Sequence, residues 1–175
     1  MGLHEKSQSN QTDLPHDYLP SLTEVGGNLP KHYLIPGTLF VSSEPCLITT
    51  VLGSAIAVCL WDNSLQIGGM NHFTQPDGEI PCSTKYARAA NEELLWQMLQ
   101  MGADPTTLTA SIFGGSLPAI IFGNVGKCLG ECNLNAAEKF LAQQKIGIRK
   151  RETGGVKGRK LVFQTSDGKT WAQQL

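Results

Sequence analysis

Residues 56–73 read IAVCLWDNSLQIGGMNHF, and this stretch predicts a β-hairpin at the centre of the fold. Residues 56–61 are almost wholly apolar, as a buried strand requires. The polar run DNS at 62–64 is a turn signal, and residues 65–73 form the returning strand. The pair Gly68–Gly69 inside that strand indicates a bulge or a close approach of neighbouring backbone.

Strands and two helices are expected around this hairpin. The clearest helix covers residues 83–101, where apolar side chains recur every three or four positions until Gly102. It should bury Leu94, Leu95 and Met98 and leave Glu92, Glu93 and Gln97 in water. The other expected elements are strands at 38–41, 47–51, 108–113, 146–151 and 160–165, a helix at 135–143 and a hairpin turn at 167–168. This mixture predicts a single-domain α/β fold of mixed α+β layers.

The chain has 175 residues, of which 41% are hydrophobic and 17% charged, so a wholly disordered protein is excluded. We expect a flexible tail at residues 1–30 and one domain at 31–175. The tail lacks the apolar segment of a secretory signal, and no run approaches the roughly 20 apolar residues of a membrane span. The five cysteines form no disulfide framework, so a cytoplasmic protein with reduced thiols is expected.

Charge is distributed unevenly along the chain. Residues 1–137 hold five basic and twelve acidic side chains, whereas residues 138–175 hold nine basic and three acidic ones. A solvated basic face explains this pattern most simply, and a docking patch for an acidic partner is the alternative. Nucleic acid is not expected as a partner, because the basic segment has no interleaved aromatic residues and no nucleic-acid motif.

One histidine stands out as a candidate for chemistry. His72 ends the second strand of the hairpin and leads into a loop at 74–81, a place where sites are commonly built. A histidine in a strand is more often a satisfied structural residue, but the glycine pair before it leaves room for backbone or substrate. The spacing of Cys128 and Cys132 does not match a zinc site, so no metal is expected.

Two segments of the hairpin region carry a family resemblance. Residues 52–62 (LGSAIAVCLWD) and 68–73 (GGMNHF) resemble the CheD family of bacterial chemotaxis proteins, the chemoreceptor glutamine deamidases. The similarity covers most of residues 35–170. It continues through KYA at 85–87, MGA at 101–103, IFGGS at 112–116, NVG at 124–126, TGG at 153–155 and GR at 158–159.

The resemblance implies an α/β/α sandwich that hydrolyses side-chain amides of particular glutamines. Its substrates would be methyl-accepting chemotaxis receptors, contacted at their cytoplasmic helical bundle, and the CheC phosphatase is a further implied partner. The implied reaction is a cysteine–histidine thiol mechanism with ammonia as the leaving product. It needs no cofactor, no metal and no membrane insertion.

Carried over residue by residue, the family histidine is His72 and an assisting threonine is Thr49. The position of the nucleophilic cysteine is occupied by Ala55, so the chain as written is expected to be inactive. Neighbouring Ser54 points to the other face of an extended chain, and Cys59 lies about 13 Å further along the strand, so neither replaces the missing thiol. The implied substrate-binding residues are Gly53, Ser54, Asn71 and Asn124.

Two features depart from the family pattern. The first is the alanine at position 55. It is explained either by an engineered change or by a natural pseudoenzyme that only binds receptors or CheC, and the intact His72 and Thr49 favour the engineered change. The loop at 124–133 is longer than the common Asn-Ile-Gly-x-Arg-Asn motif and lacks its arginine. Asn124 and Asn133 are the best equivalents of the two asparagines of that motif.

Overall fold

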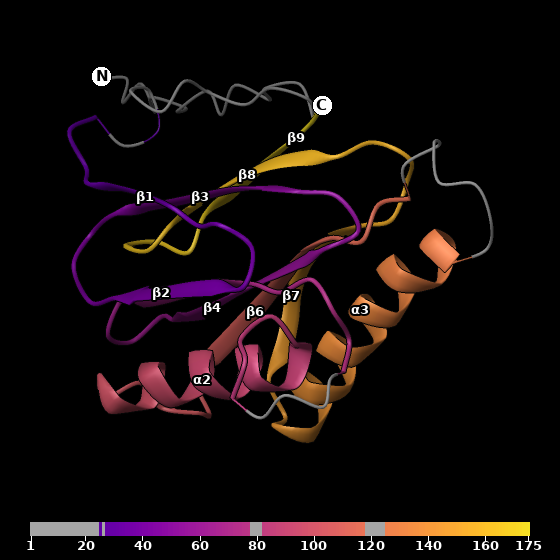
Figure 1. The fold of residues 1–175 in the computed structure, drawn as a ribbon. Coiled ribbons are helices and arrows are strands. Elements are labelled where there is room, and N and C mark those ends of the chain that lie inside the picture. The colour runs from indigo at the N-terminus through magenta and orange to yellow at the C-terminus, as the bar shows by residue number, and fades with distance from the viewer. Residues whose placement is uncertain (1–24, 26, 78–81, 118–124) are drawn as a thin grey trace, which may run out of the picture.

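A computed structural model describes residues 25, 27–77, 82–117 and 125–175 (Figure 1). The expected tail at 1–30 lies mostly outside the described residues, and the first strand begins at Lys31. The described elements are β1 (Lys31–Tyr33), β2 (Thr38–Ser42), β3 (Leu47–Leu52), β4 (Ile56–Asp62), β5 (Ile67–His72), α2 (Ala87–Gln100), β6 (Leu108–Gly114), α3 (Val125–Gln143), β7 (Gly147–Thr153), β8 (Arg159–Gln164) and β9 (Thr170–Gln174).

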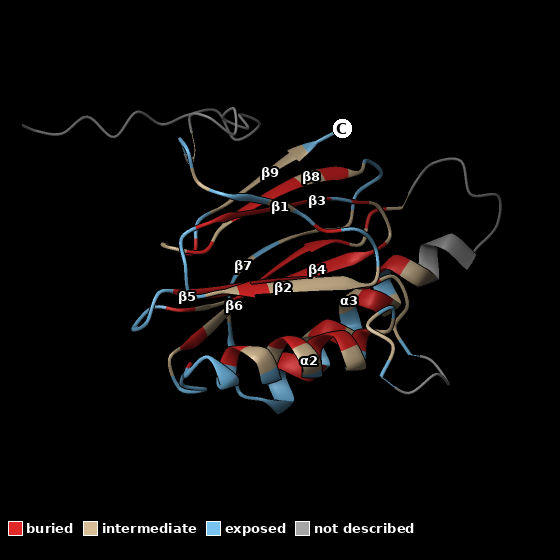
Figure 2. Cartoon of the chain, turned by 60° about the vertical axis from the view of Figure 1, so that its left-hand side comes forward, coloured by how far each residue is buried: buried red, intermediate tan, exposed pale blue. Residues whose placement is uncertain are grey.

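The strands form two stacked sheets, and the two described helices cover one of them. The small sheet has the order β1-β3-β8-β9 and the large sheet the order β2-β5-β4-β6-β7. Figures 1 and 2 show the small sheet on one face of the large sheet, with α2 and α3 on the opposite face. The mixed α/β class is therefore confirmed, but the layer order is sheet, sheet, helices. The expected α/β/α sandwich differs because a second sheet takes the place of one helical layer.

Two apolar cores separate these three layers. One lies between the large sheet and the helices and includes Leu94 and Met98, both fully buried as expected. The other lies between the two sheets and includes Ile48 of the small sheet and Met70 of the large one. Because side chains alternate along a strand, β2, β4, β5 and β6 of the large sheet each contribute to both cores.

The predicted hairpin is confirmed, and its glycine pair marks close approaches. β4 and β5 pair antiparallel, with Cys59 opposite Met70. A Cβ on Gly68 would lie 2.9 Å from the Cα of Thr165 in the neighbouring segment of the small sheet. A Cβ on Gly69 would lie 2.8 Å from a methyl group of Leu94 on α2. The large sheet therefore approaches both neighbouring layers here closely enough to exclude any side chain.

Both helices differ from their predicted limits. α2 begins at Ala87 rather than at residue 83, because the hydroxyl of Thr84 donates to the carbonyl of Gly37 instead of capping the helix. α3 begins at Val125 rather than at residue 135. Gly130 lies inside this helix. Glycine is needed there for packing, because a Cβ would lie 2.7 Å from the carbonyl oxygen of Gly115. Neither helix, in the part of the chain described, is long and apolar enough to cross a membrane.

Candidate active site

The start of β4 and the end of β5 bring position 55 and His72 onto one face of the large sheet. Ile56 pairs with Phe73 through two backbone hydrogen bonds of 3.1 and 3.0 Å. This register places Ala57 opposite His72 and Ala55 one diagonal step away, a Cα separation of about 7–8 Å in such pairs. The face they share points toward the small sheet, since Ala55 and Ala57 both belong to the core between the sheets.

The ring of His72 is held by the small sheet. Its Nδ1 lies 2.9 Å from the hydroxyl oxygen of Thr50 on β3, and both residues are buried. That hydroxyl donates its only proton to the carbonyl of Leu34 at 2.8 Å. The Thr50 oxygen can then only accept from the ring, so Nδ1 carries the proton and Nε2 keeps a free lone pair. This is the tautomer that a general base working through Nε2 requires.

Burial decides the charge of this histidine. Only 2% of the surface of His72 is exposed. Burial lowers the pKa of His72 to about 4, and the hydrogen bond with the backbone of Leu34 opposes this shift only in part. His72 is therefore neutral at pH 7. A neutral imidazole can accept a proton, whereas an imidazolium cannot.

The structure brings Thr50, and not Thr49, to His72. Along β3, Ile48, Thr50 and Leu52 face the large sheet, because successive side chains alternate. Thr49 therefore faces the other side of the small sheet, and its hydroxyl lies 3.5 Å from the backbone carbonyl of His32. The sequence pattern could have indicated this, because Thr50 lies two residues from both Ile48 and Leu52 and therefore shares their face of the strand.

The backbone around position 55 is fixed on three sides. The N–H of Gly115 donates to the carbonyl of Ala55 at 2.8 Å, and the N–H of Ser116 donates to the carbonyl of Gly53 at 2.8 Å. From α3, the side-chain amide of Asn133 donates to the carbonyls of Ser54 and Thr74, each at 3.0 Å. Position 55 is thus held in place although it precedes the first paired residue of β4.

Two buried polar atoms beside this segment have no hydrogen-bond partner among the described residues. They are the hydroxyl of Ser116 and the side-chain carbonyl of Asn133. Both residues are fully buried, and each already touches the 53–55 segment through its own N–H group. Unsatisfied buried polar atoms are uncommon in folded proteins and often mark a functional region. The sequence indicated Asn133 only as a motif equivalent and did not indicate Ser116.

The other predicted substrate contacts are placed differently. Asn71 is fully buried on the helix side of the large sheet, where it accepts from the N–H of Val58 at 2.9 Å and donates to Asn91 at 2.8 Å. Its amide bridges β4, β5 and α2 and does not share the face of His72. Asn124 lies outside the described residues. Burial raises the pKa of the Cys59 thiol, which agrees with its rejection as a nucleophile.

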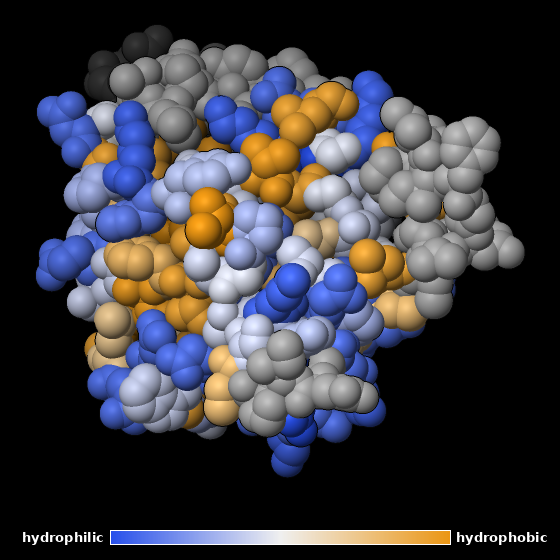
Figure 3. Space-filling view, viewed as in Figure 1, coloured by the Kyte–Doolittle hydropathy of each residue, from blue (hydrophilic) through white to orange (hydrophobic). Residues whose placement is uncertain are grey.

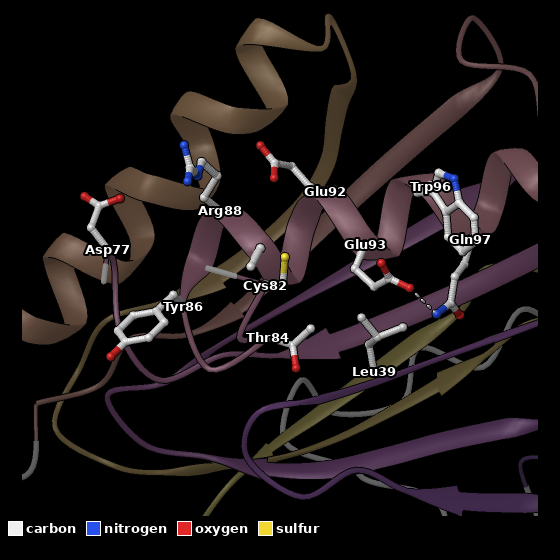
Figure 4. A pocket seen from close by; sticks show the side chains of 11 residues that line it. Leu39, Asp77, Cys82, Thr84, Tyr86, Arg88, Glu92, Glu93, Trp96 and Gln97 are labelled. Atoms are coloured by element: carbon white, nitrogen blue, oxygen red, sulfur yellow. Dashed lines mark hydrogen bonds between the residues drawn. The ribbon is translucent and has the colours of Figure 1, made fainter. Parts of the chain in front are cut away.

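A large cavity over the described residues lies elsewhere. It has a volume of about 800 Å³ and runs along the outer side of α2, between Asp77, Arg88 and Trp96 (Figure 4). Glu93 and Gln97 hydrogen-bond to each other at 2.8 Å on its wall. Neither Ala55 nor His72 lines it. The buried pair of positions is therefore not open as a wide cleft, and Ala55 keeps only 8% of its surface exposed.

Comparisons with known proteins agree on one family. Residues 72–174 match the family model described as CheD chemotactic sensory transduction. A protein of Anaeromyxobacter dehalogenans named "Probable chemoreceptor glutamine deamidase CheD 1" is 38% identical over 87% of this chain and 90% of its own length. A "Probable chemoreceptor glutamine deamidase CheD" of Trichlorobacter lovleyi is 40% identical over 82% of this chain and 89% of its own length.

Proposed function

Because the chain belongs to the CheD chemotactic sensory transduction family, we propose that it is a chemoreceptor glutamine deamidase whose nucleophile position holds Ala55. Its substrates are glutamine side chains of methyl-accepting chemotaxis receptors, which it converts to glutamate when cysteine stands at position 55. One observation carries the proposal: the buried ring of His72, whose Nδ1 lies 2.9 Å from the Thr50 hydroxyl, shares a face of the large sheet with that position.

The reaction follows from these groups once a thiol stands at position 55. Nε2 of His72 takes the thiol proton, and the thiolate attacks the carboxamide carbon. The tetrahedral intermediate expels ammonia, which receives its proton from the imidazolium, and a thioester remains. Water then attacks the thioester carbon while His72 accepts a proton, and the thiol leaves with that proton to release glutamate. The imidazolium beside the sulfur also favours the thiolate.

Thr50 takes the assisting role that the sequence resemblance assigned to Thr49. A hydroxyl that accepts from Nδ1 keeps the ring in one tautomer and one orientation through the reaction. It can also accept from the doubly protonated ring formed after the first proton transfer. Thr49 faces away from the ring, so its effect on the reaction should be small.

Without the thiol, the proposed scaffold binds and does not turn over. A natural pseudoenzyme that regulates receptors or the CheC phosphatase by occupancy is the second candidate function, and Ala55 is the observation that favours it. The two candidates share a docking surface and differ in one side chain. The proposed place of action is the cytoplasm, where the receptor bundle lies.

The proposed docking surface surrounds the 53–55 segment. Val51 is 42% exposed at the end of β3, two residues before Gly53, and Val156 is 64% exposed beside Gly155. Gly155 in turn accepts a hydrogen bond from Leu117, which follows the turn that holds Ala55. Figure 3 shows apolar groups set among polar ones on the face that it views. Exposed apolar side chains beside the 53–55 segment suit a partner surface that offers apolar contacts around its glutamines.

The test restores the thiol and measures the product. Ala55→Cys and the original chain are each incubated with a receptor cytoplasmic fragment from the same cell, and mass spectrometry locates any glutamine converted to glutamate. We expect glutamine to be converted to glutamate by the Ala55→Cys chain and not by the original chain. Adding His72→Gln should reduce the rate by about 10²- to 10⁴-fold, whereas His32→Gln serves as a matched histidine control. A folded Ala55→Cys chain that binds the fragment without converting it would leave the pseudoenzyme as the function.

A further inference from the structure

Arg159 is a buried cation whose charge has no obvious structural use. It begins β8 opposite Leu52, and only 6% of its surface is exposed. Its two terminal nitrogens donate to backbone carbonyls, one to Gly114 at 2.9 Å and one to Gly154 at 2.8 Å. The ion pairs found among the described residues are formed by Lys150, Arg151 and Lys169 and leave Arg159 without a carboxylate within 4.0 Å.

Two carbonyl groups do not explain why a full charge is buried there. Burying a charge is costly unless something opposite compensates it, and a neutral donor would satisfy a carbonyl at lower cost. Burial lowers the pKa of Arg159, and the charge of Glu152 opposes this in part. Glu152 is itself paired with Lys150 at 2.8 Å. The positive charge of Arg159 is therefore only weakly neutralised.

A short chain of contacts joins Arg159 to position 55. The carbonyl of Gly114 accepts from Arg159 and from the N–H of Gly154, and the next N–H, that of Gly115, donates to the carbonyl of Ala55 at 2.8 Å. Adding the bonds of this path gives an upper limit of roughly 8 Å between the guanidinium and that carbonyl. A Cβ on Gly114 would lie only 2.1 Å from the same carbonyl oxygen, so the turn has no room to shift.

We infer that Arg159 is a positioning residue for position 55, where its guanidinium fixes the Gly114–Gly115 turn and its charge favours the anionic form of a thiol. The inference rests on the proposed function and adds a second source of thiolate stabilisation besides His72. In this inference the charge of Arg159 stabilises the thiolate, and its two hydrogen bonds hold the Gly114–Gly115 turn in position.

Among the buried groups described around this path, Arg159 is the main positive charge. His72, from β5, is neutral because burial lowers its pKa to about 4. Glu152, from β7, is the acid whose charge reaches Arg159, and Lys150 of the same strand pairs with it. Cys59, from β4, stays protonated because burial raises its pKa.

The experiment measures the pKa of a thiol at position 55 from the pH dependence of its alkylation. The peptide containing residue 55 is followed by mass spectrometry, so that the other cysteines do not interfere. Ala55→Cys is compared with the same chain carrying Arg159→Gln, Arg159→Met or Arg159→Lys. Arg149→Gln is the matched control, because Arg149 also donates to a carbonyl, that of Gly168, and lies over Trp61 at the other end of β4.

The expected thiol pKa values distinguish an effect of the Arg159 charge from a purely structural role of this side chain. Adding the bonds from the Ala55 carbonyl oxygen to a thiol sulfur at position 55 extends the upper limit to roughly 14 Å. At that distance and an effective dielectric constant of about 20, removing the charge should raise the thiol pKa by roughly one unit. Arg159→Gln and Arg159→Met should both show this rise, whereas Arg159→Lys and Arg149→Gln should change the thiol pKa by less than half as much.

Two results would overturn the inference and leave the proposed function intact. One is a low thiol pKa in Ala55→Cys that persists in folded Arg159→Gln or Arg159→Met. The other is unfolding of both neutral variants beside a folded Arg159→Lys, since a charge needed only for folding has a structural role alone. An ordinary thiol pKa in Ala55→Cys with Arg159 intact would contradict the proposed function itself.

Discussion

The two ends of β4 differ in how fully their buried polar groups are hydrogen-bonded. At the Asp62 end, formed by residues 61–65 and 104–107, the buried Asp62 carboxylate accepts hydrogen bonds at both oxygens from groups of Ser64, Leu65, Asp104 and Thr107. At the site end, formed by residues 53–55, 72–74 and 114–116 with Asn133, two buried polar atoms have no hydrogen-bond partner among the described residues, and the tautomer inferred for His72 leaves a lone pair on Nε2. The ends lie about 20 Å apart along the strand.

We interpret this difference as one between a structural polar network and the proposed site. A fully satisfied buried carboxylate stabilises the fold and has no capacity left for a ligand. Unpaired groups reduce stability, and they are retained where a substrate or a reaction uses them. The comparison therefore supports the site end as the proposed site independently of any relative. Substitutions at either end can be compared with matched positions elsewhere.

The largest expected effect is loss of the fold at the site end through Gly114→Ala. Gly114 has φ +107°, and its added Cβ would meet the Ala55 carbonyl oxygen at 2.1 Å. We expect the free energy of unfolding to fall by about 3 kcal/mol or more. Gly147→Ala, a strand position with open space around it, should change it by less than about 0.5 kcal/mol. Chemical denaturation of both variants measures this, and equal effects would contradict the described turn.

At the other end, Asp62→Asn should cost about 1–3 kcal/mol. Burial alone would raise the pKa of Asp62, but the hydrogen bonds it accepts lower it to about 2. Asparagine turns an NH₂ group toward the donors of Asp104 and Thr107, so at least one of them is left unpaired. Asp167→Asn in an exposed turn is the control and should cost less than about 1 kcal/mol. The midpoints of urea unfolding decide between these outcomes.

The pH dependence of stability should report His72. The unfolded chain binds a proton at His72 with the ordinary pKa of 6.5, whereas the folded chain binds it only near pH 4. The free energy of unfolding should therefore fall as pH falls from 6.5 toward 4, by on the order of 1–3 kcal/mol. His72→Gln should remove this part of the pH dependence. A flat curve across that window for the chain without further substitution would contradict the burial of a neutral ring.

The two adjacent threonines provide the smallest and most specific comparison. Thr50→Val removes the partner of both Nδ1 of His72 and the Leu34 carbonyl, and we expect a loss of about 1–2 kcal/mol. Thr49→Val removes only a 3.5 Å contact and should cost less than about 0.5 kcal/mol. In the Ala55→Cys chain, Thr50→Val should also slow deamidation more than Thr49→Val does. The reverse order would return the assisting role to Thr49.

The sequence predicted much of the large sheet and one half of the site. The apolar run at 56–61 and the turn at 62–64 located the central hairpin, and the helical spacing of Leu94 and Met98 gave the buried face of α2. His72 was identified from its place at a strand end. These features are local, so they can be read from neighbouring residues.

What the sequence did not predict depends on contacts between distant segments. The short strand β1 and the layer order follow from the parallel pairing of β1 with β3, although β2 of the other sheet lies between them in the chain. The start of α3 follows from a glycine contact with Gly115. The choice of Thr50 over Thr49 depends on which face of β3 meets the large sheet. The role of Arg159 depends on two turns that only the fold brings together.

The most direct test of the central claim is the protonation state of His72 in the chain as it stands. Nitrogen NMR of the imidazole rings, with His72→Gln used to assign the signal, reports which ring nitrogen carries the proton. At pH 7 we predict a neutral ring protonated at Nδ1, with Nε2 unprotonated and ready to accept a proton from a thiol at position 55. A ring protonated at Nε2, or one charged at pH 7, would contradict the account.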